Sequence, residues 1–128
     1  MEEQQINYSK ESTSFILKEK ISDMMKYGNP ATANFPRRDR QLADSIRRSM
    51  LAMLRLAIQI EKKYYKKTTL QELDIELDVL RHLIRVAQDK DYYGPKIAPP
   101  LPFKKYEYWS KLLNEIGRII GGYMKFVK

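Results

Sequence analysis

Apolar residues recur along the chain at steps of three and four positions, the spacing that places side chains on one face of a helix. Four segments carry this pattern, over about residues 12–27, 37–67, 69–87 and 103–126. Glycine, proline and threonine residues separate them, and such residues typically mark the end or the start of a helix. No segment alternates with the period of two that a strand requires. The pattern therefore predicts an all-α protein, an antiparallel four-helix bundle.

The second predicted helix is apolar on one side and cationic on the other. Its apolar stripe follows steps of three and four residues, and we expect these side chains in the core: Leu42, Ile46, Met50, Met53, Ala57, Ile60 and Tyr64. The opposite face, a sector of about 100° on a straight helix, carries the cations Arg37, Arg40, Arg47, Arg48, Arg55, Lys62 and Lys66. Such a helix can bury one face and offer the other to an anionic partner.

The third predicted helix has the most regular apolar spacing in the chain. It opens with Thr69 and Glu72, the spacing of a capping box, in which each side chain accepts from a backbone N–H near the start of the helix. Its apolar positions then alternate at three and four residues: Leu70, Leu73, Leu77, Leu80, Ile84 and Ala87. This segment is expected to begin at its capping box and to bury one continuous stripe.

The fourth predicted helix carries three different faces. One is apolar and contains Trp109, Leu113, Ile116, Ile120 and Tyr123, and a second repeats a cation every seven residues at Lys104, Lys111, Arg118 and Lys125. Gly117 and Gly121 share a third face. Because glycine destabilises a helix interior, this pair suggests a close helix–helix contact, either inside the bundle or between subunits. The aromatic residues Tyr106, Tyr108, Trp109 and Tyr123 either complete the core of the protomer or also serve an oligomer interface.

Charge is concentrated in two of these segments. The net charge is +8. Residues 37–67 hold ten basic against three acidic side chains and residues 103–128 hold six against two, so the remainder of the chain is net acidic. A positive field of this kind attracts polyanions such as nucleic acid, or acidic protein surfaces. The alternative is an ordinary solvated basic surface.

The sequence lacks the residues that most catalytic schemes need. It has no cysteine and one histidine, His82. Val79 stands three positions before it, where a Glu-x-x-His metal motif would need glutamate, and Asp78 stands four positions before it. There is no glycine-rich phosphate loop and no GxSxG elbow. We therefore expect a non-catalytic protein without metal or cofactor. We also expect it to be soluble and cytoplasmic, with residues 1–11 as a flexible segment before one domain over residues 12–128.

Particular runs of residues resemble known families. Asn34-Phe35-Pro36, followed by QLADSIRR at 41–48, resembles the second-helix signature of the four-helix-bundle family of ribosomal RNA intervening-sequence proteins. LDIELDVLRHLIR at 73–85 and YEYWSKLLNEIGR at 106–118, continuing through IIGG at 119–122, are similar to the accessory variability determinant, Avd, of diversity-generating retroelements. The resemblance covers about residues 12–126, and the Pro-rich link over residues 90–102 is longer than the family pattern.

The resemblance implies a basic, barrel-shaped homopentamer that associates with a reverse transcriptase and with RNA or DNA during mutagenic copying of a template RNA. On this basis we expect the basic stripes to bind the phosphate backbone without reading sequence. The candidate nucleic-acid-binding residues are Arg38, Arg47, Arg48, Arg55, Lys62, Lys111, Arg118 and Lys125. The alternative is a ribosome- or rRNA-associated interaction protein with the same bundle and no polymerase partner.

Arg81 and Arg85 form a second candidate site. They lie one turn apart in the cationic second half of a helix whose first half is acidic, and both fall in the segment that resembles Avd. We therefore expect this pair to bind the polymerase partner. The alternative is intrahelical ion pairing, because Asp78 precedes Arg81 by three residues and Asp89 follows Arg85 by four.

Overall fold

Four long helices form the body of the protein in a computed structural model. The structure describes residues 10–127, and side chains from Thr13 onward. The long helices are α2 (Lys10–Ala33), α3 (Arg40–Lys62), α4 (Lys67–Gln88) and α6 (Phe103–Met124), joined by the short helices η1 (Arg37–Asp39) and α5 (Lys90–Tyr93). Across residues 10–127 there is no strand. The prediction of an all-α bundle is confirmed. Of the segment 1–11 that was expected to be flexible, residues 1–9 lie outside the described part, and Lys10 and Glu11 begin α2.

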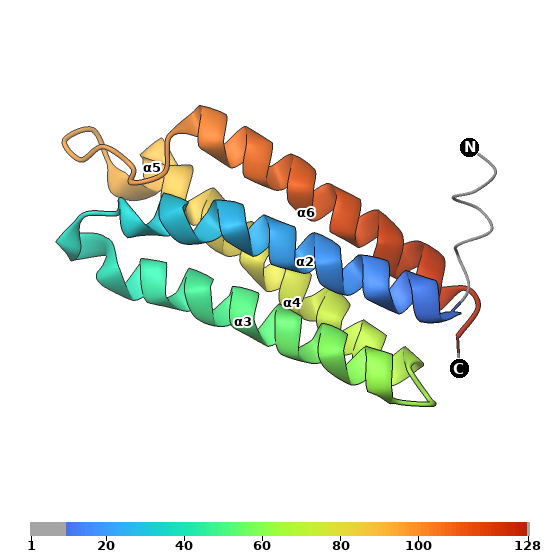
Figure 1. Ribbon diagram of the computed structural model, residues 1–128. Helices are drawn as coiled ribbons and strands as arrows, with labels where there is room; N and C mark the ends of the chain where they lie inside the picture. The colour runs from blue at the N-terminus through green and yellow to red at the C-terminus, as the bar shows by residue number, and fades with distance from the viewer. Residues whose placement is uncertain (1–9, 128) are drawn as a thin grey trace.

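The long helices run alternately up and down, so each is antiparallel to both of its neighbours (Figure 1). α3 packs between α2 and α4, and α6 closes the bundle by packing on the same two helices. α3 and α6 therefore occupy opposite corners, with α2 and α4 between them (Figure 1). This arrangement decides which basic side chains can share a surface.

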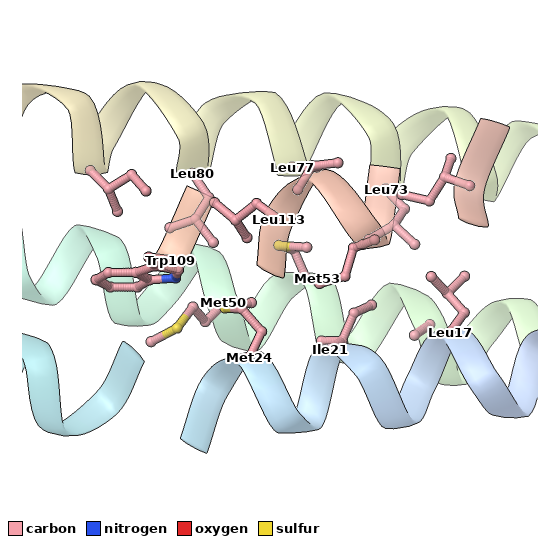
Figure 2. Packing of buried hydrophobic residues seen from close by; sticks show 14 of the residues in the cluster. Leu17, Ile21, Met24, Met50, Met53, Leu73, Leu77, Leu80, Trp109 and Leu113 are labelled. Carbon is pink, nitrogen blue, oxygen red and sulfur yellow. The ribbon is translucent and has the colours of Figure 1, made fainter. Parts of the chain in front are cut away.

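All four helices contribute to a single apolar core. Figure 2 shows Leu17 and Ile21 from α2, Met53 from α3, Leu77 from α4 and Leu113 from α6 converging between the ribbons, and all five are fully buried. Full burial of each such side chain contributes about 1.5–3 kcal/mol. The predicted stripes of α4 and α6 are buried throughout, so the sequence pattern located the core on these two helices.

α2 is longer than its pattern predicts, because it continues through Gly28, Asn29 and Pro30 to Ala33. Gly28 faces the core, where a Cβ atom would lie 2.5 Å from Cζ2 of Trp109. Pro30 is exposed. One turn later Thr32 donates its hydroxyl to the carbonyls of Gly28 and Asn29, at 3.1 and 2.9 Å. The prediction that the helix ends at Tyr27 was wrong, because tertiary packing holds the last turn in place.

α3 is shorter than predicted and ends at Lys62. The side chain of Lys66 donates to the carbonyls of Ile60 and Lys63, near the end of the helix, where such carbonyls lack a partner within it. Tyr64 lies beyond this end and is 76% exposed. Its predicted place in the core was therefore wrong, and Leu42 at the other end of the stripe is half-buried.

The predicted capping box does not form. α4 begins at Lys67, two residues before Thr69, and has no side-chain cap. The Thr69 hydroxyl accepts instead from Nζ of Lys63 at 2.9 Å and is buried. The α3–α4 turn is therefore fixed by two lysines, Lys63 and Lys66, which bond back to the helix ends.

The Pro-rich connection between α4 and α6 is anchored to the bundle. Leu101 is buried, and its N–H donates to the carbonyl of Ala87 at 3.0 Å. The Tyr93 hydroxyl donates to Oδ1 of the buried Asp39 at 2.8 Å, and Nη2 of Arg38 donates to the carbonyl of Ala98, also at 2.8 Å. Burial of the Tyr93 side chain, its hydrogen bond to Asp39 and the negative charge of the Asp39 carboxylate raise the pKa of Tyr93 above its ordinary value. The connection is thus tied to the α2–α3 junction.

Candidate nucleic-acid and partner surfaces

Three cations of α3 form a straight row on its outward face. Arg48, Arg55 and Lys62 are all exposed and recur every seven residues, so the row spans about 21 Å at 1.5 Å per residue. Within the described residues none of the three forms an ion pair. We call these residues the α3 row. Its charges are available to an anionic partner without breaking an internal contact.

Two other predicted nucleic-acid residues have contacts inside the protein. Arg47 lies beside the α3 row, half-buried, with Nη1 3.7 Å from Oδ1 of Asp44. Arg38 bonds the Pro-rich connection, and its Nε lies 3.4 Å from Oδ2 of Asp39. Arg38 thus has a structural role, and its assignment to nucleic acid stays a prediction.

The cations of α6 form a second row on another side of the molecule. Lys111, Arg118 and Lys125 are exposed at the same seven-residue interval. Arg118 also borders a groove of about 640 Å³ between α2 and α6, where Nζ of Lys20 lies 2.9 Å from Oε2 of Glu115. Because α3 and α6 occupy opposite corners, the α3 row and this α6 row do not form one continuous surface within a protomer.

The two candidate partner-binding arginines have different surroundings. Arg81 is half-buried between α4 and α6, with Nη2 3.4 Å from Oδ1 of Asn114, whereas Arg85 is exposed. Neither of the two intrahelical ion pairs offered as the alternative is present among the described residues, since Asp78 instead faces His82 at 4.0 Å and Asp89 caps α5. Arg85 is therefore the more accessible member of the pair.

Of the two glycines of α6 that were predicted to mark a close helix–helix contact, only Gly117 lies at a contact between helices of the protomer. A Cβ at Gly117 would lie 2.7 Å from Nη2 of Arg81 and 3.4 Å from Cδ2 of Leu77, so Gly117 makes room for side chains of α4, not for another backbone. Among the described residues, nothing lies within 4 Å of a Cβ built at Gly121. Among the aromatic residues, Trp109 and Tyr123 belong to the core, whereas Tyr108 is 51% exposed. Gly121 and Tyr108 remain available for contact with another molecule.

The turn between α3 and α4 exposes two aromatic residues that the sequence interpretation missed. Tyr64 and Tyr65 are 76% and 70% exposed, and their ring centroids are 4.8 Å apart. The signal was present, since two adjacent tyrosines stand between lysine pairs in the run KKYYKK at 62–67. Tyr64 was assigned to the core because it continues the apolar spacing of α3.

Comparison with known proteins identifies the chain at the level of its family. The bAvd-like family matches residues 15–127, which include nearly all of the four long helices. No curated protein matches the sequence. Among the described helices none is long and apolar enough to cross a membrane. The resemblance to Avd noted from the motifs on α4 and α6 is confirmed by the family match.

Proposed function

The chain belongs to the bAvd-like family, and from this premise we propose that it is a non-catalytic accessory protein of a diversity-generating retroelement. In this role it binds the reverse transcriptase and the template RNA, or the RNA/DNA hybrid, during mutagenic copying. Family membership supports the accessory role, and the α3 row supports the contact with nucleic acid. The observation that carries the proposal is this row of three exposed cations, none of which forms an ion pair with another residue in the range 10–127.

The α3 row suits recognition of a phosphate backbone. Its cations project from one rigid helix, and little ordering is needed to present them together. Lys and Arg contacts to phosphate release counterions, so they give an affinity that depends on salt and tolerates any sequence. An accessory protein that accompanies a polymerase along a template needs binding of this kind.

Assembly into a homopentamer is part of the proposal. The resemblance to Avd supports it, and so do the open position at Gly121 and the large apolar side chain of Ile75, which is 65% exposed on the outward face of α4. Apolar exposure of this kind often marks a contact surface. A closed ring would repeat the α3 row five times around one axis, which raises the positive field that each phosphate meets.

A reconstituted reverse-transcription reaction tests the function. The cognate polymerase and template RNA are incubated with the wild-type protein, or with Arg48→Gln/Arg55→Gln/Lys62→Gln, and cDNA yield is measured. We expect the wild type to stimulate synthesis and the variant to lose most of that stimulation.

The matched control is Lys26→Gln/Lys90→Gln/Lys96→Gln, which removes three exposed charges outside both rows. It should stimulate synthesis like the wild type. A cDNA yield that does not change when the wild-type protein is added would contradict the accessory role. Equal losses of stimulation in both variants would mean that the α3 row acts only through its contribution to the net charge.

A further inference from the structure

The α3–α4 turn is built in a way that the fold itself does not require. Tyr64 and Tyr65 are the two most exposed large apolar residues among the described side chains, at 76% and 70%. They lie at the tip of the hairpin that α3 and α4 form (Figure 1). Exposed tyrosines add nothing to the core, so their presence there points to contact with another molecule.

The turn that carries these tyrosines is pre-ordered. Lys66 donates to the carbonyls of Ile60 and Lys63, and Lys63 donates to the hydroxyl of Thr69 at 2.9 Å. The two lysines thereby hold both sides of the turn. A platform that is already ordered loses little conformational entropy when a ligand binds.

The two rings present separate faces. Their planes are nearly perpendicular, at 89°, with the centroids 4.8 Å apart. Because they meet edge to face, they cannot both lie flat against one planar group. Each ring can instead receive its own planar group, which suits successive unpaired bases of a flexible strand.

Exposed cations flank the two tyrosines on both sides along the chain. Lys62 and Lys67 are exposed, at the last position of α3 and the first of α4. Lys62 is also the terminal member of the α3 row, so the row of phosphate-binding charges leads directly to the aromatic tip. A strand whose phosphates follow the row would bring its bases to the tyrosines.

We infer that the α3–α4 turn is a stacking site for unpaired bases of single-stranded nucleic acid, with Tyr64 and Tyr65 as the platform and Lys62 and Lys67 as phosphate contacts. This inference rests on the proposed binding of nucleic acid and goes beyond it by naming the form that is bound. In duplex the bases are stacked on one another and closed to the rings, so the site selects single strands.

Fluorescence anisotropy with three probes tests the site: a mixed-sequence single-stranded RNA, its duplex, and inorganic polyphosphate, which has phosphates without bases. Loss of each stacking contact lowers affinity about 5- to 150-fold. We expect Tyr64→Leu/Tyr65→Leu to weaken binding of single-stranded RNA by at least about 5-fold. The variant should leave the affinity for polyphosphate and the slope of affinity against salt unchanged. Leucine keeps apolar bulk, whereas Tyr64→Phe/Tyr65→Phe keeps the rings and should bind as the wild type does.

Tyr92→Ala is the matched control, because Tyr92 is 67% exposed and belongs to an adjacent tyrosine pair outside the basic turn. It should not change RNA affinity. If the leucine variant binds RNA as the wild type does while the α3 row variant is weakened, the stacking site is refuted and the proposed function stands. Absence of any RNA binding by the wild type overturns both. A changed oligomeric mass in the leucine variant, with RNA affinity retained, assigns the tyrosines to a protein contact and also overturns the inference.

Discussion

Replacement of Gly28 by alanine should destabilise the protein, although the same change stabilises an ordinary helix. In an open helix interior, alanine is favoured over glycine by about 1 kcal/mol. At Gly28 the new methyl carbon would lie 2.5 Å from Cζ2 of Trp109 and 2.7 Å from Sδ of Met50. The sulfur belongs to a flexible side chain, but the indole is a rigid ring that is fully buried in the core.

Overpacking of this kind costs typically 1–3 kcal/mol. After the gain in helix propensity of about 1 kcal/mol is subtracted, we expect a net loss of stability of up to about 2 kcal/mol and a fall in Tm of up to several degrees for a domain of this size. The assay is urea unfolding followed by circular dichroism, with both proteins at the same concentration because assembly adds to apparent stability.

Gly122→Ala provides the matched comparison, because no atom of the described part of the chain lies within 4 Å of a Cβ at that helical position. It should stabilise the protein by up to about 1 kcal/mol. The reasoning about Gly28 would be refuted if both substitutions stabilised the protein equally. That outcome would mean that Trp109 does not limit the approach of α2.

Three further predictions concern the connection, assembly and the polymerase contact. Tyr93→Phe removes the hydrogen bond to Asp39 and should speed amide hydrogen exchange over residues 90–102. The raised pKa of Tyr93 favours the neutral phenol in the folded state. The stability of the wild type should therefore fall more steeply than that of the variant as the pH rises above about 10. Gly121→Leu fills an open surface position and should lower the mass found by light scattering with little change in helicity, whereas an unchanged pentamer would exclude Gly121 from the interface. Arg81→Ala/Arg85→Ala should keep helicity and mass but lose the reverse transcriptase in a pull-down, and full retention would return both arginines to a structural role.

The helical core was predictable from the sequence because its determinants are local. Steps of three and four residues place Leu73, Leu77 and Leu80 on one face of α4, and burial of that face requires no knowledge of the partner helices. The same holds for the outward α3 row, whose seven-residue interval keeps its members aligned. Fold class and surface rows therefore follow from periodicity alone.

Features that depend on tertiary contacts were not predictable in this way. The continuation of α2 through Pro30 depends on Gly28 fitting beneath Trp109, which is 81 positions away in the sequence. Tyr64 continues an apolar period but lies beyond the end of α3, at Lys62, where Lys66 donates back to the carbonyls of Ile60 and Lys63. The diagonal separation of α3 and α6 likewise follows from packing, and it places the two basic rows on different sides of the protomer.

The salt dependence of RNA binding tests the central claim most directly. Each lost phosphate contact flattens the slope of log K against log salt by about 0.7 for a single strand, so Arg48→Gln/Arg55→Gln/Lys62→Gln should flatten it by up to about 2. The charge-matched variant Lys26→Gln/Lys90→Gln/Lys96→Gln should keep the wild-type slope. If both variants show the same slope as the wild type, or the same reduction, then the α3 row is not the nucleic-acid surface and the account is contradicted.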